Sequence, residues 1–230
     1  MLGSGRSVRD KLEPSGVGMG INDYHFVTRW LVPGTPREVS DVLGDPADLP
    51  RWWPSVYLEA ERLAPGGPDG VGRAVRLRTR GWLPYTLDWT LTVTESRDPH
   101  GFTFDAAGDL EGRGEWSLES AGAWAGVSFD WRIEARKPLL RLLAPLLRPA
   151  LEANHRWAMR RGEESLKLEL ERRRAPSEWE RERIAAPPGP ATRSGWILLG
   201  AAAGALALLA AAAGETARRR RRRWPRRFWR

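Results

Sequence analysis

The chain has 230 residues and a formal net charge of +8, the size of one domain with appendages. Nine arginines, beginning with Arg218 and ending with Arg230, lie in a stretch without acidic residues, which leaves 28 basic against 29 acidic residues in residues 1–217. This nearly neutral body argues against nucleic-acid binding by the folded domain, and the lack of cysteine excludes disulfides, thiolate catalysis and Cys-ligated metals.

Residues 1–21 are rich in glycine and charge, and they contain no apolar run long enough for the core of a signal peptide. We expect a disordered leader, with Met19 as an alternative start of translation. The histidines of the chain, His25, His100 and His155, are far apart and lack the spacing of metal ligands. We therefore expect neither a metal nor a cofactor.

The first predicted element is a strand over residues 24–32, in which every second side chain belongs to one face. The residues of that face are Tyr24, Phe26, Thr28, Trp30 and Val32. Thr35 followed by Pro36 predicts an N-cap and the first turn of a short helix that runs through Leu43. The next segment, ADLPRWWPS (47–55), has room for about one helical turn between its prolines.

A strand pattern then continues from residue 56 to residue 133. Val56, Leu58 and Ala60 alternate with polar residues, and residues 74–80 place arginines on one face and aliphatic side chains on the other. Further alternating runs cover residues 85–93, 102–106, 116–118 and 127–133. Links of hairpin length predict an antiparallel meander with one face in water.

The segment GDLEGRG (108–114) is predicted to be a tight connection between two of these strands. Asp109 is expected to shape its turn, because aspartate side chains bond their own backbone there. Arg113 either meets an anionic group of a ligand or faces solvent.

A long helix is predicted from Pro138 to Arg174. Its apolar stripe, read at steps of three and four residues, consists of Leu140, Leu143, Leu147, Leu151, His155, Ala158, Gly162 and Leu166. His155 and Gly162 stand where leucine is expected, and Asn154 borders the stripe. A helix that closes one side of a cavity has a use for such residues, whereas a helix packed on a filled core has none.

This order of elements, with the strings VPGTPREVSDVLGD (32–45), LPRWWPSV (49–56), GDLEGRGEW (108–116), FDWRIEARKP (129–138) and NHRWAMRRGEESL (154–166), resembles the helix-grip superfamily. That superfamily (SRPBCC) includes START lipid-transfer domains and polyketide cyclase/dehydrase-like proteins. The resemblance covers residues 22–174 and implies an α+β helix-grip fold, a curved antiparallel sheet wrapped around a long C-terminal helix. It also implies a deep apolar cavity between sheet and helix. It implies no universal catalytic set, so no catalytic residue is assigned.

Large inward side chains and the polar residues of the long helix are the predicted ligand-binding residues. They are Trp30, Trp89, Phe104, Trp116, Trp131, Leu151, Asn154, His155 and Met159. His155 is the candidate acid or base, and its alternative is a core histidine bonded to a backbone carbonyl or to a carboxylate of the sheet. Asn154 either orients a ligand carbonyl or caps a neighbouring loop, and Met159 either contacts ligand or packs in the core.

The remainder of the chain is predicted to be a linker (175–195), an apolar segment (196–214) and an Arg-rich tail (215–230). The apolar segment has 19 uncharged residues. As a helix it would be about 28 Å long, close to the hydrocarbon thickness of about 30 Å, so we expect a single transmembrane helix. Its alternatives are an Ala-rich helix in water and a shallow insertion with the arginines on anionic headgroups. Without an export signal, the domain is expected to be cytoplasmic and membrane-associated.

Three functions remain open on the sequence. The first is binding or carriage of a hydrophobic small molecule or lipid at a membrane. The second is a cyclase or dehydratase that uses His155 as acid or base. The third is an interaction module whose basic tail binds anionic lipid or nucleic acid.

Overall fold

This computed structural model describes residues 23–136 and 138–191, without the side chains of residues 135 and 138–147. The predicted leader, the apolar segment 196–214 and the Arg-rich tail lie outside the described residues. The helices are α1 (Pro36–Leu43), the short 3-10 helix η1 (Pro46–Asp48), α2 (Leu49–Trp52), α3 (Pro138–Arg174) and α4 (Glu178–Arg183). The strands are β1 (Asp23–Pro33), β2 (Tyr57–Ala64), β3 (Ala74–Thr79), β4 (Leu87–Ser96), β5 (Gly101–Gly108), β6 (Leu110–Ala121) and β7 (Trp124–Ala135).

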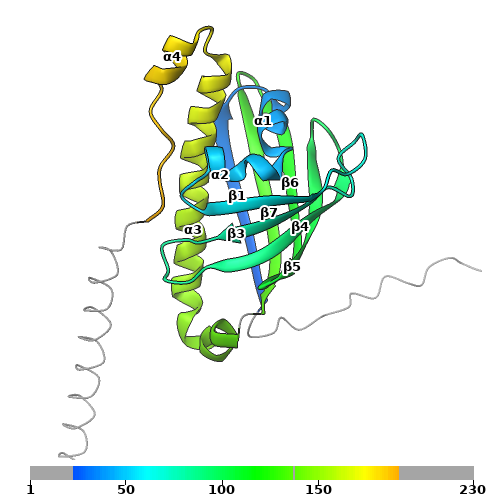
Figure 1. Cartoon of the computed structure of the whole chain (residues 1–230), viewed down its shortest axis with the longest axis vertical. Helices are drawn as coiled ribbons and strands as arrows, with labels where there is room; N and C mark the ends of the chain where they lie inside the picture. Colours follow the sequence, from blue (N-terminus) through cyan, green and yellow to red (C-terminus); the bar gives the residue numbers. More distant parts are fainter. Residues whose placement is uncertain (1–22, 137, 192–230) are drawn as a thin grey trace, which may run out of the picture.

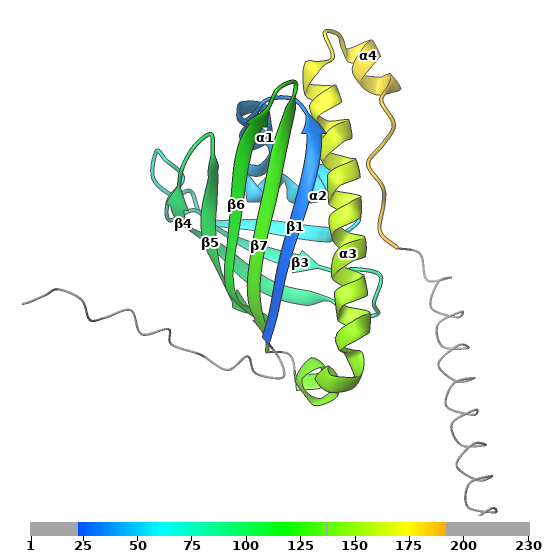
Figure 2. The same ribbon diagram turned by 180° about the vertical axis from the view of Figure 1, so that it is seen from behind.

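The seven strands form one antiparallel sheet in the order β1-β7-β6-β5-β4-β3-β2. Strands β2 to β7 are the predicted meander, and β1 pairs with β7 over its whole length. Figures 1 and 2 show the sheet curving around one side of α3, with α1 and α2 beside the upper half of that helix. The predicted α+β helix-grip fold is therefore confirmed for the described residues.

Buried and exposed side chains alternate along the strands, as the sequence pattern predicts, and the buried ones form the inward face of the sheet. Trp30 and Val32 of β1 are buried and Leu31 between them is exposed. On β3, Val75 and Leu77 are buried, and Arg76 and Arg78, which alternate with them, face water. One face of the sheet thus supplies the core, and the other is solvated.

Helix α1 begins where the sequence predicts. Thr35 is its N-cap, and the backbone N–H of Glu38 donates to Thr35 Oγ1 at 3.3 Å while Thr35 N–H donates to Glu38 Oε2 at 2.8 Å. Arg174, the last residue of α3, donates to Glu38 Oε1 at 2.7 Å. These bonds, the one from Arg174 first, lower the pKa of Glu38 to about 2 and join the ends of the two helices.

The predicted stripe of α3 faces the core over the part whose side chains are described. Gly162 and Leu166 are buried, and Leu151, His155 and Ala158 are half-buried. The stripe residues Leu140, Leu143 and Leu147 have undescribed side chains. On the opposite face, Lys167 pairs with Glu163 at 2.7 Å, which agrees with the charged outer surface expected there.

Three local predictions need correction. Residues 110–114 belong to strand β6, so the predicted connection at 108–114 shrinks to Asp109, whose backbone N–H donates to Asp88 O at 3.0 Å. Arg113 is therefore a strand residue, paired at the surface with Glu95 at 2.6 Å. Helix α4 lies inside the predicted linker. Tyr57 opens β2, and the register shift after it breaks the simple alternation of residues 56–60.

Among residues 23–136 and 138–191, no helix combines the length and apolarity needed to cross a membrane. The predicted transmembrane helix, residues 196–214, is outside that range.

Candidate functional site

Two adjoining cavities lie between the inward face of the sheet and α3. The first, here the aromatic chamber, has a volume of about 120 Å³, and the second, the tyrosine chamber, has about 130 Å³. Both are lined by Val56, Thr79, Leu110, Trp131, His155 and Ala158. These shared residues form the boundary at which the chambers meet.

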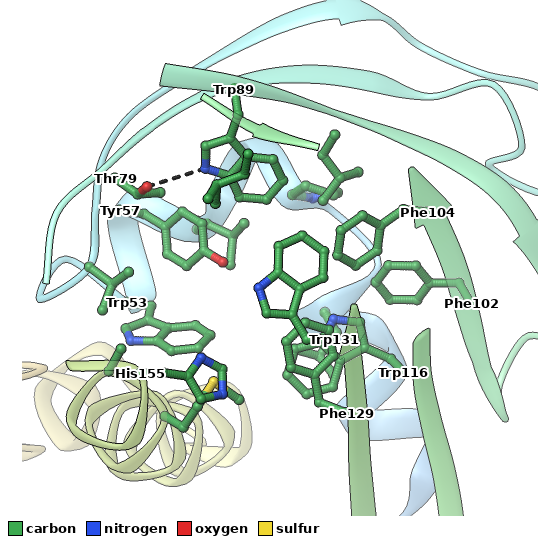
Figure 3. Close-up of a pocket in the computed structure, with 18 residues that line it drawn as sticks. Trp53, Tyr57, Thr79, Trp89, Phe102, Phe104, Trp116, Phe129, Trp131 and His155 are labelled. Carbon is green, nitrogen blue, oxygen red and sulfur yellow. Dashed lines mark hydrogen bonds between the residues drawn. The ribbon is translucent and has the colours of Figure 1, made fainter. Parts of the chain in front are cut away.

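Figure 3 shows the aromatic rings that wall the aromatic chamber. Most of them come from the neighbouring strands β4, β5, β6 and β7. Trp116 stacks on Phe129 with centroids 4.1 Å apart, and the ring of Trp131 lies 5.4 Å from Phe104 and 5.8 Å from Trp89. Trp116 and Phe129 are paired residues of the neighbouring strands β6 and β7. Phe104 and Trp131 lie on β5 and β7 and meet over Gly114 of β6, which is paired with both and has no side chain to separate their rings. The packed rings give the chamber an apolar wall.

The glycine in the apolar stripe of α3 makes room for a chamber wall. A Cβ at Gly162 would lie 2.3 Å from Cζ2 of Trp53, which follows α2 and is 2% exposed. The indole therefore reaches the helix backbone at a point where any side chain would push it into the chamber. Gly162 was unexplained by the stripe pattern, and the approach of Trp53 accounts for it.

An ion cluster around the buried carboxylate of Glu169 fixes helix α2, which Trp53 directly follows. Glu169 of α3 is 2% exposed, and its carboxylate accepts hydrogen bonds from Arg51 of α2 at 2.7 and 2.8 Å and from Arg173 at 2.8 Å. Burial alone raises the pKa of Glu169, but the two guanidinium groups outweigh it, and the pKa is lowered overall. The carboxylate is thus ionised at neutral pH and holds α2 against α3.

His155 lies where the two chambers meet. Its ring stacks on Phe26 of β1 with centroids 4.0 Å apart and an interplanar angle of 15°, and its Nε2 lies 3.4 Å from Thr28 Oγ1. Burial, with a smaller contribution from the charge of Arg156, lowers the pKa of His155 from 6.5 to about 4. His155 is therefore a neutral cavity residue beside a hydroxyl, and within the described chain it has neither the carboxylate nor the carbonyl partner considered from the sequence.

Asn154 caps a loop, one of the two roles that the sequence allows. Its Oδ1 accepts the backbone N–H groups of Trp82 at 2.8 Å and Leu83 at 3.2 Å, in the connection between β3 and β4. A Cβ at Gly81 would lie 2.1 Å from that oxygen, so the amide requires glycine there. The loop it holds contributes Arg80, Gly81 and Tyr85 to the tyrosine chamber.

Polar groups are few in the aromatic chamber. Trp89 Nε1 donates to Thr79 Oγ1 at 3.2 Å. The other polar side chains of the lining are His155, the phenol of Tyr57 and the indoles of Trp53, Trp116 and Trp131. Burial raises the pKa of Tyr57, so its phenol stays protonated. Trp53 Nε1 is buried and finds no hydrogen-bond partner among the described residues.

Eight of the nine predicted ligand-binding residues line a chamber. Trp89, Phe104, Trp116 and Met159 line the aromatic one, Leu151 and Asn154 line the tyrosine one, and Trp131 and His155 line both. Trp30 does not: its ring lies 5.3 Å from Trp116 and 5.9 Å from Trp53, behind the wall that those rings form.

The sequence missed several lining residues, chief among them Trp53, Tyr57, Tyr85 and Phe129. Phe129 lies on the same strand face as Trp131, so the alternation of that strand could have predicted it as a lining residue. Tyr57 was hidden by the register shift in β2, and Trp53 by a turn whose orientation no periodicity reveals.

Three solved structures share the architecture. The TTHA0849 protein of Thermus thermophilus is 17% identical with a TM-score of 0.54, over 66% of this chain and 100% of that one. The Zhui aromatase/cyclase of a Streptomyces species is 19% identical with a TM-score of 0.54, over 68% and 98%. The di-domain ARO/CYC StfQ of the steffimycin biosynthetic pathway is 15% identical with a TM-score of 0.50, over 66% and 52%. These likenesses establish the fold.

No curated protein sequence matches the chain. The sequence profile of the family described as "Polyketide cyclase / dehydrase and lipid transport" matches residues 24–171, well over half of the chain and nearly all of β1 to α3. The chain therefore belongs to the polyketide cyclase/dehydrase and lipid transport family, within the START-like helix-grip superfamily that its sequence resembles.

Proposed function

We propose that residues 23–174 bind an uncharged, mainly apolar small molecule in the two chambers beneath α3. The observation that carries this proposal is the lining of the aromatic chamber. None of its described residues carries a charge at neutral pH, because His155 is kept neutral by burial. A rigid apolar wall with a few oriented polar groups is the usual form of a small-molecule site.

The chamber volumes favour ring compounds over lipids with long chains. A dry cavity of about 150 Å³ is known to hold one benzene molecule, so each chamber matches about one ring. A ligand with two aromatic groups would occupy both chambers and cross the boundary beside Trp131 and His155. A two-chain lipid would need a much larger space than the chambers offer.

Binding is favoured over cyclase or dehydratase catalysis by the state of His155. A general base works best with a pKa near the operating pH, whereas the pKa of His155 is about 4. Thr28 Oγ1 is its hydrogen-bonding neighbour in the described chain, and a hydroxyl orients an imidazole without raising its basicity as a carboxylate would. The ring is suited to accept a hydrogen bond from ligand.

The ligand proposal is tested with N-phenyl-1-naphthylamine, an uncharged fluorophore that brightens in apolar sites. Titration of the full chain should give a saturable increase with one site per chain. Ala158 lines both chambers, so Ala158→Phe should weaken binding at least about tenfold by filling them. The matched change Ala186→Phe, at an exposed position of the segment after α4, should have no effect. Equal binding by both variants would place the probe elsewhere and reject the proposal.

We also propose that residues 196–214, followed by the Arg-rich tail, hold the domain at the cytoplasmic face of a membrane. The support is compositional: the segment is uncharged over 19 residues and nine arginines follow it. Ending the chain at residue 195 should move the protein from the membrane fraction to the soluble fraction. Protease should reach the domain in inverted vesicles and not in intact cells; an unchanged distribution or the opposite protection pattern would contradict this arrangement.

A further inference from the structure

The hydroxyl of Tyr24 is a buried polar group without a hydrogen-bond partner in the part of the chain that the structure describes. Tyr24 is 5% exposed, lines the tyrosine chamber, and its hydroxyl makes no hydrogen bond within the described residues. Buried hydroxyls in native proteins are nearly always hydrogen-bonded, since leaving one unpaired forfeits its bonds to water. We therefore expect a molecule other than the protein to supply a hydrogen-bond partner for this hydroxyl.

The surroundings of Tyr24 fix its ring in the chamber wall. Tyr24, Phe26 and Thr28 are alternate inward residues of β1, and the rings of Tyr24 and Phe26 stack with centroids 5.9 Å apart. Phe26 in turn stacks on His155. The guanidinium of Arg148 lies 5.7 Å from the centroid of the Tyr24 ring and pairs with Glu152 at 3.2 Å. Tyr24 is thus held by packing, while its hydroxyl remains free to bond a ligand.

A second phenol lies close to the first. Tyr85, held by the loop that Asn154 caps, packs against Tyr24 and lines the same chamber. Burial, and then the nearness of Tyr24, raise the pKa of Tyr85, and burial likewise raises the pKa of Tyr24. Both phenols are protonated at neutral pH and can donate. Among the described residues that line the chamber, Arg80 carries the one charge, and it is positive.

The two chambers therefore differ in chemistry. The aromatic chamber has rings on most sides, whereas the tyrosine chamber offers two O–H donors and a guanidinium, without a carboxylate in its described lining. A ligand oxygen that accepts hydrogen bonds fits the second chamber, and a hydrocarbon ring fits the first.

We propose that Tyr24 is a specificity-determining residue whose hydroxyl donates to an acceptor oxygen of the ligand, a carbonyl or ether, and so orients the ligand. Tyr85 flanks the same oxygen, and the hydrocarbon part of the ligand lies against Trp131 in the aromatic chamber. This inference rests on the proposed function, since it assumes that the chambers bind a small molecule.

The test compares two ligands with the same bicyclic skeleton, 1-tetralone, which has a carbonyl, and tetralin, which has none. Both are used to displace N-phenyl-1-naphthylamine from the full chain, and the quantity compared is the ratio of their dissociation constants, tetralin over tetralone. We expect Tyr24→Phe to lower this ratio about tenfold by weakening tetralone binding and leaving tetralin binding unchanged. Ser165→Ala removes another buried hydroxyl without a hydrogen-bond partner among the described residues, at a position of α3 that lines neither chamber, and it should leave the ratio as in wild type.

Stability gives a second readout. Because the Tyr24 hydroxyl has no hydrogen-bond partner among the described residues, Tyr24→Phe should unfold at the same temperature as wild type or a higher one. A lower unfolding temperature would show that the hydroxyl serves the fold. An unchanged ratio, or an equal fall in Ser165→Ala, would show that Tyr24 does not recognise the oxygen. If neither compound displaces the fluorophore from wild type, the proposed binding function itself fails, and this inference with it.

Discussion

The buried neutral state of His155 predicts a specific loss of stability in acid. The pKa of His155 is lowered from 6.5 to about 4 in the folded chain, mainly by burial. Between these values the unfolded chain binds the proton more readily than the folded one. The folded state therefore carries no penalty above about pH 6.5, loses stability as the pH falls, and bears the whole penalty below about pH 4.

The size of the effect follows from the shift. One pKa unit corresponds to about 1.4 kcal/mol, so the upper limit is about 3.5 kcal/mol. His155 is partly exposed to solvent, which screens the charge, so we expect about 2 kcal/mol between about pH 7.5 and about pH 4.5. Replacing His155 by Gln keeps a polar group near Thr28 and removes the titration.

The assay is urea unfolding of wild type and His155→Gln at both pH values. Protonation of buried or paired carboxylates such as Glu169 also lowers the stability of the folded protein in acid. These carboxylates are present in both proteins, so their effect cancels in the comparison. The stability of the variant relative to wild type should rise by about 2 kcal/mol on going to the lower pH. If the difference between the two proteins is the same at both pH values, His155 is not held neutral by burial, and its assignment as an uncharged chamber wall is refuted.

Three further substitutions test the surroundings of the chambers. Gly162→Ala should cost about 1–3 kcal/mol and weaken fluorophore binding, because the added carbon displaces Trp53, whereas Gly189→Ala, which meets no described atom within 4 Å, should do neither in the same measurements. Asn154→Ala should increase hydrogen exchange of the two capped loop amides, and Asn154→Asp, which keeps the acceptor, should restore most of their protection. Glu169→Gln should cost about 3 kcal/mol in urea unfolding, and the cost should shrink as the pH falls through the carboxylate pKa; a cost that does not change with pH would contradict the ionised cluster.

Much of the fold could be read from the sequence because its signals are local. The alternation in β1 and the Thr35–Pro36 start of α1 each depend on residues within one element, and both appear at the predicted positions. The long helix was equally clear, since its stripe persists for many turns. Where a pattern was interrupted, the interpretation failed: glycines at 112 and 114 suggested a turn but belong to β6.

The site could be predicted in composition and less well in geometry. Periodicity tells which face a residue occupies, but not whether its ring borders a cavity or supports another ring. It therefore grouped Trp30, which packs on Trp53 and Trp116 and lines neither chamber, with the residues that do. Contacts between distant segments leave no such periodic signal. The approach of Trp53 to Gly162 and the bonds from Arg51 to Glu169 join residues more than a hundred positions apart.

The central claim is that the space between the sheet and α3 is a ligand site. It is tested most directly by a crystal structure of the full chain grown with N-phenyl-1-naphthylamine. We predict that the fluorophore lies beneath α3, with its naphthyl group among Trp89, Phe104 and Trp131 and its phenyl ring beside His155 and Tyr24. A structure in which the chambers are closed by the protein's own side chains, with the fluorophore absent or bound on the outer surface, would contradict the claim.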